Sequence, residues 1–410
     1  MRAYVIGAGL SGLVAAEALS RTRPVTLLEA SPKAGGRCRS YRDERLGRVI
    51  DNGNHLILSA NARVLAWAER IGGADGLRTG DAAFPFLDLA SGDRWTIRPG
   101  RGPLGAAAAE ARPPGTSLAR LGLQIARALG HPGTVAQAIP DRGPLWRAFW
   151  DPMTRAVLNE DPQDGSARLL ARTMLRSFAR GARHSRPVLA PDGLGPALID
   201  PALDLLAARG ADLRLRTPVT ALHGADRLAR IETRDGPVDL GPTDVAVLAT
   251  PSHHAAQLLG HDAPPAGKTI ANAHFLLPDS GLPPILALLG GTSHWLFRRG
   301  DVVSVTVSAA ESAGLPATRE AALETLWRDV AAAARAHGAA VPDAMPTARL
   351  IKEKNATFDQ SPQAIRTRTG PGTKWPNLAL AGDHAATGLP ATLEGAVLAG
   401  ERAAARLERA

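Results

Sequence analysis

Several kinds of residue are scarce in this 410-residue chain, and each scarcity excludes a class of protein. Cys38 is the only cysteine, so no disulfide can form within the chain. Aromatic residues make up 4% of the chain, and only Tyr4 and Tyr41 are tyrosines. No apolar run reaches the roughly 18 residues that a membrane-spanning helix needs. With 45% hydrophobic and 21% charged residues, the composition is that of an ordinary globular protein.

Lysine is also scarce, although the formal net charge is +9: only five of the 48 basic residues are lysines. The excess of arginine accompanies many alanines, glycines and prolines, a pattern typical of GC-rich coding. The few aromatic residues do not alternate with the basic ones, as a stacking surface for bases requires. We therefore expect no nucleic-acid partner. An apolar strand is expected from residue 2, which leaves no room for a signal or transit peptide, so we expect a bacterial-type cytoplasmic protein.

What the chain does contain is a complete nucleotide-binding βαβ pattern at its start. Residues 2–6 form a short β-prone run, residues 13–19 have the pattern of a helix, and residues 25–28 form a second apolar run. The turn between the first run and the helix consists of Gly7, Ala8, Gly9, Leu10, Ser11 and Gly12. The second run ends on Glu29, seventeen residues after Gly12. Strand, glycine turn, helix, strand and acid together indicate a dinucleotide site.

Each residue type in this pattern has a mechanical role. Gly7 permits the tight turn, Gly9 lets the backbone approach a pyrophosphate, and Gly12 lets the helix pack close to the strand. The N-terminus of the helix offers free N–H groups and the positive end of its dipole to the phosphates. Glu29 is placed to accept hydrogen bonds from ribose hydroxyls.

The residues after this acid favour FAD over NAD. Ala30 follows the acid directly, and the turn formed by Gly35, Gly36 and Arg37 then brings a cation back toward the phosphates. An NAD enzyme usually continues from the acid into a crossover helix instead. This arrangement resembles the flavoprotein superfamily of amine oxidases and phytoene desaturases. The resemblance implies FAD as the cofactor.

Two later segments extend the predicted cofactor site. Gly53, between polar residues and followed by Asn54 and His55, fits a loop that passes close to a flat ring, although a simple turn would have the same composition. Near the end of the chain, residues 377–381 form a strand that ends in Gly382 and Asp383. This aspartate can bind ribityl hydroxyls. Ala391 and Thr392 precede a helix over 393–407, whose N-terminus would face the flavin ring where negative charge accumulates on reduction.

Two stretches between residues 100 and 190 have the periodicity of basic amphipathic helices. In residues 117–129 one face carries Leu118, Leu121, Ile125, Ala128 and Leu129, and the opposite face carries Arg120, Gln124 and Arg127. In residues 166–180 the basic face carries Arg168, Arg172, Arg176 and Arg180, opposite Leu170, Met174 and Phe178. Such helices can lie on an anionic membrane surface. Taken alone, the pattern favours ordinary surface helices that pack their apolar side on the core, and both interpretations stay open.

The rest of the chain predicts an interrupted domain order. Residues 84–97 have the pattern of a hairpin, residues 244–251 return to the nucleotide domain, and strands at 274–277, 285–289, 295–297 and 302–307 precede a helix over 319–337. We expect an α/β protein with a discontinuous Rossmann-like FAD-binding domain and an α+β substrate domain that contains an antiparallel sheet and helices. The FAD-binding domain would comprise residues 1–78, 189–262 and 373–410, and the substrate domain residues 79–188 and 263–372.

The whole chain resembles the hydroxysqualene dehydroxylases of bacterial hopanoid biosynthesis, also called squalene-associated FAD-dependent desaturases. The resemblance is carried by the stretches 35–40, 51–56, 149–154, 272–275, 303–309, 352–354 and 388–396. It implies reduction of hydroxysqualene to squalene by reduced FAD, contact of Val219 with the adenine, peripheral attachment to the inner membrane and contact with other enzymes of the squalene pathway.

The implied reaction needs a proton donor, because hydroxide is a poor leaving group. His55, Lys352 and Lys354 are the catalytic candidates, since their motifs approach the flavin in the resembling enzymes. For any one of them, a buried structural role is the favoured interpretation. His253 and His254 are adjacent and have no third ligand at useful spacing, so we expect no metal site.

Three rival functions remain open. A carotenoid-type desaturase would use the same fold with the flavin in the oxidative direction. An amine oxidase typically surrounds its flavin with aromatic residues, which residues 382–394 lack. A non-catalytic flavoprotein scaffold for prenyl-synthesising enzymes would show no reaction of its flavin with hydroxysqualene. The fold alone does not separate these functions.

Overall fold

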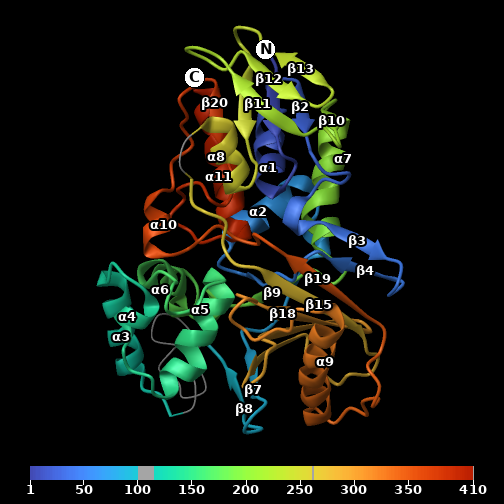
Figure 1. Ribbon diagram of the computed structural model, residues 1–410, viewed down its shortest axis with the longest axis vertical. Helices are drawn as coiled ribbons and strands as arrows, with labels where there is room; N and C mark the ends of the chain where they lie inside the picture. The colour runs from blue at the N-terminus through green and yellow to red at the C-terminus, as the bar shows by residue number, and fades with distance from the viewer. Residues whose placement is uncertain (100–114, 261–262, 410) are drawn as a thin grey trace.

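Residues 1–99, 115–260 and 263–409 are described by the computed structural model of the chain (Figure 1). Residues 100–114 of the predicted basic helical region, and residue 262 at a predicted domain boundary, lie outside these described residues. No helix within the described ranges is both long and apolar enough to cross a bilayer.

A parallel sheet of five strands forms the nucleotide half, at the top of Figure 1. In spatial order the strands are β10 (Asp212–Arg214), β2 (Val25–Leu28), β1 (Ala3–Ile6), β14 (Val245–Leu248) and β20 (Leu378–Leu380). Every residue of β1, β2, β14 and β20 is buried, as expected for strands covered on both faces. Ile6 lies beside Leu28 and Leu248, so the carboxyl ends of these strands meet at one edge.

Two different layers cover this sheet. One face packs against α1 (Leu10–Leu19), α2 (Ala62–Ile71), α7 (Asp200–Ala208) and α11 (Leu393–Glu408). The other face packs against α8 (Ser252–Leu259) and an antiparallel sheet of β11 (Val219–His223), β12 (Arg230–Thr233) and β13 (Gly236–Asp239). The contact between α1 and α11 depends on Gly400, because a Cβ there would lie 2.4 Å from the carbonyl oxygen of Ser11.

A mostly antiparallel sheet of seven strands forms the lower right of Figure 1, with α9 (Arg319–Ala336) on one face. Its strand order is β19 (Ala348–Glu353), β15 (Ile270–Leu276), β18 (Val302–Val307), β17 (Trp295–Arg299), β16 (Ile285–Leu289), β7 (Phe84–Asp88) and β8 (Arg94–Ile97). Only β16 and β7 pair in parallel within it. Along β15, Ala271, Ala273 and Phe275 pack toward α9, so Asn272 points to the opposite face.

A helical cluster stands beside this sheet, at the lower left of Figure 1. It comprises α3 (Leu118–Gly130), α4 (Val135–Ala138), α5 (Asp151–Leu158) and α6 (Ala167–Arg176), packed around the fully buried Trp150. Short elements connect the halves: β3 (Ser40–Asp43), β4 (Arg48–Asp51), β5 (Ile57–Leu58), β6 (Arg78–Thr79), β9 (Pro187–Leu189) and α10 (Pro362–Arg366).

The predicted α/β fold class is confirmed, as are the strands at 285–289 and 302–307. The domain boundaries stay a prediction. The second basic helix ends at Arg176, and Phe178–Arg180 forms a separate 3-10 turn. Gln124 was expected on the polar face of α3 but is buried, because Trp150 donates its indole N–H to the Gln124 side chain at 2.7 Å.

Candidate functional site

A cavity of about 1370 Å³ runs from the carboxyl edge of the parallel sheet to the space between the seven-stranded sheet and the helical cluster. Most predicted cofactor residues meet at its surface, although they come from separate segments of the chain. Those that line it are Gly7, Gly9, Leu10, Ser11, Glu29, Ala30, Gly35, Gly36, Arg37, Gly53, Asn54, His55, Val219, Gly382, Asp383, Ala391 and Thr392. Ala8 and Gly12 belong to the same glycine turn but do not contribute to the cavity surface.

The glycines of this turn have two kinds of surroundings. Gly7 has a φ of +99°, and a Cβ there would lie 2.7 Å from the carbonyl oxygen of Ala249. A Cβ on Gly12 would lie 2.0 Å from the carbonyl oxygen of Gly7. Around Gly9, by contrast, a Cβ would meet nothing within 4 Å. Gly7 and Gly12 are therefore required by the packing of the chain itself, whereas Gly9 borders open space of the kind a pyrophosphate needs.

Glu29 braces the glycine turn from the end of β2. Its Oε2 accepts a hydrogen bond from the backbone N–H of Ala8 at 2.8 Å, and its Oε1 accepts one from Ser31 at 2.8 Å. Each carboxylate oxygen has a further lone pair, so both can still accept from a ribose hydroxyl. The carboxylate thus fits its predicted role and also fixes the turn.

An ion pair joins the two ends of the sequence beside the cavity. Arg37 donates from Nη2 to Oδ1 of Asp383 at 2.8 Å and from Nη1 to the carbonyl oxygen of Ala356 at 2.6 Å. Burial opposes ionisation of Asp383, but the charge and hydrogen bond of Arg37 outweigh it and lower the pKa of Asp383. The pKa of Arg37 is raised, chiefly by the charge of Asp383. Both groups are therefore charged at neutral pH, and both face the cavity.

The N-terminus of α11 also faces the cavity. Thr392 caps this helix, because its Oγ1 accepts a hydrogen bond from the backbone N–H of Gly395 at 3.2 Å. The preceding N–H, of Ala391, donates to Oε1 of the fully buried Gln360 at 2.9 Å. The first turn of a 16-residue helix with its positive dipole end at the cavity is the arrangement that the sequence predicts for the flavin ring.

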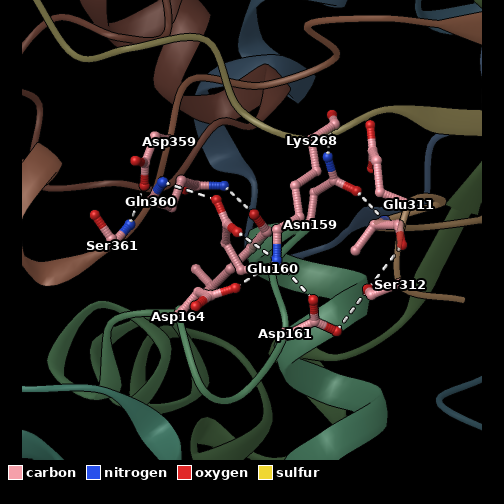
Figure 2. Close-up of polar contacts among 12 residues, drawn as sticks. Asn159, Glu160, Asp161, Asp164, Lys268, Glu311, Ser312, Asp359, Gln360 and Ser361 are labelled. Carbon is pink, nitrogen blue, oxygen red and sulfur yellow. Dashed lines mark hydrogen bonds and ion pairs between the residues drawn. The ribbon is translucent and has the colours of Figure 1, made fainter.

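A polar cluster behind the cavity fixes this helix end, and sequence reasoning missed it. Gln360 receives support from Glu160, whose Oε1 accepts the Gln360 N–H at 3.1 Å (Figure 2). Lys268 holds the adjoining loop through Asp161 and Asp164, each at 2.6 Å. The acidic residues after α5 are visible in the sequence, but their partners lie about a hundred or more residues away and nothing in the pattern identifies them.

Beyond the glycine turn, the wall of the cavity becomes a small amide cluster. Oδ1 of Asn272 accepts a hydrogen bond from the Thr306 hydroxyl at 2.9 Å and one from Nδ2 of Asn54 at 3.3 Å. Asn54 also donates to Oγ1 of Thr306 at 3.1 Å. Asn272 and Thr306 were not among the predicted site residues. The sequence feature that could have identified them is a polar residue that alternates with small apolar residues along β15 and β18.

His55 lies next to this cluster in the cavity wall. Its Nδ1 is 3.0 Å from the carbonyl oxygen of Gly53, so Nδ1 carries a proton and Nε2 is the nitrogen that can gain or lose one. Burial lowers the pKa of His55, and the hydrogen bond to Gly53 opposes that shift only in part. The ring is therefore neutral at pH 7 and protonated only in a more acidic medium.

Lys352 and Lys354 do not reach the cavity. Both are exposed, and Lys352 donates to the carbonyl oxygen of Ala317 at 3.2 Å on the α9 side of the sheet. Because side chains alternate along β19, the residue between them points the other way: Glu353 lines the cavity and accepts a hydrogen bond from Asn52 at 2.7 Å. The two lysines thus receive no support as proton donors. The sequence prediction missed β19, and with it this alternation.

The far end of the cavity is apolar and helical. Leu118, Leu121, Ile125 and Leu129 of α3 line it, so most of the apolar face predicted from the sequence faces a cavity rather than a solid core. The remaining walls come from α5 and α6, from the short helical turns before α5 and after α6, and from aromatic residues of the seven-stranded sheet. These residues are Phe84, Phe86, Phe149, Met153, Met174, Phe178, Trp295 and Phe297.

These features fit FAD at one end of the cavity and an apolar molecule at the other. Open space beside Gly9, free lone pairs on Glu29, and the capped N-terminus of α11 match the phosphates, the ribose and the flavin ring in turn. The cavity volume exceeds the roughly 300–1000 Å³ typical of small-ligand pockets, which leaves room for a second ligand. In the described part of the chain, no group of three or more His, Cys, Asp or Glu residues could hold a metal ion.

Comparison with known proteins identifies relatives over nearly the full length. The profile of the family described as "Flavin containing amine oxidoreductase" matches residues 10–407. The hydroxysqualene dehydroxylase of Sinorhizobium fredii is 40% identical over 410 residues, covering 98% of this chain and 97% of the relative. That of Rhodopseudomonas palustris is 39% identical over 411 residues, with the same coverage. Cyclohexylamine oxidase from Brevibacterium oxydans has a similar fold, with a TM-score of 0.72 at 16% identity over 100% of this chain and 99% of that one.

Proposed function

We propose that this chain, which belongs to the hydroxysqualene dehydroxylase family of flavin-containing amine oxidoreductases, reduces the allylic alcohol hydroxysqualene to squalene. That the chain is an FAD-dependent oxidoreductase follows from the family itself. The observation that carries the choice of substrate is the agreement with these dehydroxylases over 98% of the chain. The apolar end of the cavity is consistent with an isoprenoid substrate of this kind.

The reaction balances as an alcohol and reduced FAD giving a hydrocarbon, water and oxidised FAD. Reduced FAD supplies the hydride that replaces the hydroxyl group. The C–O bond is allylic, so positive charge that develops as it breaks is delocalised over the neighbouring double bond. The apolar walls built by α3, α5 and α6 keep bulk water from this carbon.

The predicted cofactor residues divide the binding of FAD among them. We assign the pyrophosphate to the glycine turn and Arg37, the ribose to Glu29, and the adenine to Val219. Asp383, whose orientation is fixed by the Arg37 ion pair, would hold the ribityl chain. Ala391 and Thr392 would hold the flavin ring, where the N-terminus of α11 would stabilise negative charge.

We assign the proton that leaves with the hydroxyl group to Nε2 of His55. The hydrogen bond between Nδ1 and Gly53 fixes the ring with Nε2 free of any partner among the described residues. Because burial lowers the pKa of His55, its imidazolium is a stronger acid than an exposed one. Glu353 is a second candidate in this part of the cavity, because its Oε1 has no hydrogen-bond partner within the described ranges.

We further propose that the helical cluster binds the inner membrane surface peripherally. The side chains of Arg127 on α3 and Arg172 on α6 are exposed and form no ion pair or hydrogen bond within the described part of the chain. Beside them Leu123 is 72% exposed and Leu175 is 38% exposed. Because α3 and α6 also wall the apolar end of the cavity, a substrate dissolved in the bilayer would enter directly from it. Contact with other enzymes of the squalene pathway belongs to the same proposal.

The test is an anaerobic single turnover of photoreduced, purified protein. Hydroxysqualene should reoxidise the flavin and yield one squalene per flavin. A desaturase would behave in the opposite way: squalene or phytoene would bleach the oxidised flavin, and hydroxysqualene would leave the reduced form unchanged. A non-catalytic scaffold would show neither reaction.

A further inference from the structure

Among the described residues, two polar side-chain atoms of the cavity wall are buried without a hydrogen-bond partner, Oγ1 of Thr250 and Nδ2 of Asn272. Nδ2 of Asn272 makes no hydrogen bond to any described residue, and it is removed from water because the residue as a whole is only 1% exposed. An amide N–H₂ that is removed from water without an acceptor costs about 1–3 kcal/mol. Such a group in a ligand cavity points to an acceptor that arrives with the ligand.

The orientation of this amide is fixed by its neighbours. Oδ1 of Asn272 accepts from the Thr306 hydroxyl at 2.9 Å and from Nδ2 of Asn54 at 3.3 Å. A flipped amide would place its own N–H groups against the Nδ2 donor of Asn54, so the observed orientation is the one that the network allows. The oxygen is therefore occupied, and only donors remain free.

The free donors lie beside Gly53, where the two ends of the cavity meet. Nδ2 of Asn272 would lie 3.5 Å from a Cβ built on Gly53, the glycine that we place beside the flavin ring. Asn272 itself lines the cavity, as do Ile270 and Phe297 of the same sheet. An acceptor for Nδ2 would thus sit next to the place that we assign to the flavin ring, where the amide cluster meets these two apolar side chains.

We propose that Asn272 donates a hydrogen bond to the hydroxyl oxygen of the alcohol substrate and so selects the alcohol over its hydrocarbon product. This inference rests on the proposed function. Asn272 is a positioning and specificity residue: an amide N–H can hold the departing oxygen but cannot supply the proton. Once the oxygen has left as water, the amide loses its acceptor, which weakens the binding of the hydrocarbon relative to the alcohol.

Ligand binding to oxidised holoenzyme tests this without turnover. Hydroxysqualene and squalene are titrated separately while the flavin absorbance is followed, and the ratio of their dissociation constants is compared among variants. Wild-type protein should prefer the alcohol by about tenfold or more, the value of one hydrogen bond. Asn272→Leu should bring the ratio close to one by weakening only the alcohol.

Two further variants keep the test decisive if Asn272→Leu folds poorly. Thr306→Val removes the hydroxyl that orients the amide and should lower the preference partway, with squalene binding unchanged. Ser280→Ala is the matched control, because Ser280 Oγ is also buried without a partner among the described residues but lies outside this cavity. It should leave the ratio unchanged.

Each remaining outcome overturns the inference. An alcohol preference that survives Asn272→Leu shows that another group holds the oxygen. If Asn272→Leu instead shifts the absorbance of ligand-free flavin and leaves the ratio unchanged, the amide serves the cofactor and not the substrate. If the wild-type protein makes squalene but the variants leave the ratio of dissociation constants unchanged, this inference alone is contradicted. If the wild-type protein makes no squalene, the proposed function is contradicted as well.

Discussion

The two ends of the cavity are specified by the sequence in different ways. At the nucleotide end the contacts come from short segments whose residues have few alternatives: Gly12 admits no side chain, and Glu29 must reach two backbone N–H groups. At the apolar end the walls are leucines, phenylalanines and methionines on helix faces, and many other apolar residues would serve. The nucleotide end of the cavity can therefore be predicted from the sequence, whereas the residues of the apolar end have the pattern of an ordinary core.

The sharpest way to test this contrast is a pair of glycine substitutions in one turn. Gly12→Val should prevent folding, since even a Cβ would lie 2.0 Å from the Gly7 carbonyl oxygen, and overpacking of this kind costs about 3 kcal/mol or more. Gly9→Val meets no protein atom near its Cβ and should fold, but without FAD. Thermal unfolding and flavin content measure the two effects. A yellow Gly9→Val protein would refute the assignment of that space to the pyrophosphate.

At the apolar end a buried charge should abolish turnover and spare the cofactor. Ile125→Glu places a carboxylate in the cavity wall, where desolvation opposes it, and we expect single-turnover rates to fall by roughly 100-fold with hydroxysqualene. FAD content should not change. Ala119→Glu, on an exposed position of the same helix, is the control and should be active. Loss of FAD in Ile125→Glu would show that the two ends are not separable.

Where the two ends meet, His55 provides a pH signature. The pKa of His55 lies below its ordinary value of 6.5, so the protonated ring is present at low pH and is lost as pH rises through that lowered pKa. The single-turnover rate should accordingly increase toward acidic pH. His55→Gln should lower the rate by about 100-fold and remove this dependence. If the dependence persists in His55→Gln and disappears in Glu353→Gln, the carboxyl group is the donor.

The smallest expected effect concerns the outer surface of the helical cluster. Arg172→Ala removes an exposed, unpaired charge of the described structure and should weaken binding to anionic vesicles by about fivefold, near 1 kcal/mol. Arg120→Ala is the matched control, because Arg120 is already paired with Asp141. Co-sedimentation at two salt concentrations measures both. Equal binding to neutral and anionic vesicles would contradict the proposal that these helices bind an anionic membrane surface.

The same contrast explains what the sequence could predict. The sequence could predict that the glycine turn, the 35–37 turn and the 382–392 segment share a site, because each has a particular residue type at a particular spacing, and all three line the cavity. Asn272 and Thr306 were missed because each is one polar residue in a short strand, and their meeting with Asn54 depends on a register between β15 and β18 that spacing does not reveal. Lys352 and Lys354 were selected for their charge, but strand alternation directs Glu353 to the cavity instead.

The helical cluster shows the other limit of sequence reasoning. Periodicity identified the apolar face of α3, but it could not tell a face that lines a cavity from one that packs on a core. Gln124 was assigned to the polar face, although Trp150, 26 residues away, gives it a buried hydrogen-bond partner. Both outcomes depend on which distant element covers the helix.

The most direct test of the central claim is an anaerobic single turnover in D₂O. The N–H protons of reduced FAD exchange with the solvent, so a hydride delivered within the cavity should carry deuterium. We predict squalene with one deuterium on the carbon that bore the hydroxyl group, formed in equal amount to the flavin reoxidised. Squalene without deuterium at that carbon, or a flavin that stays reduced in the presence of hydroxysqualene, would contradict the account.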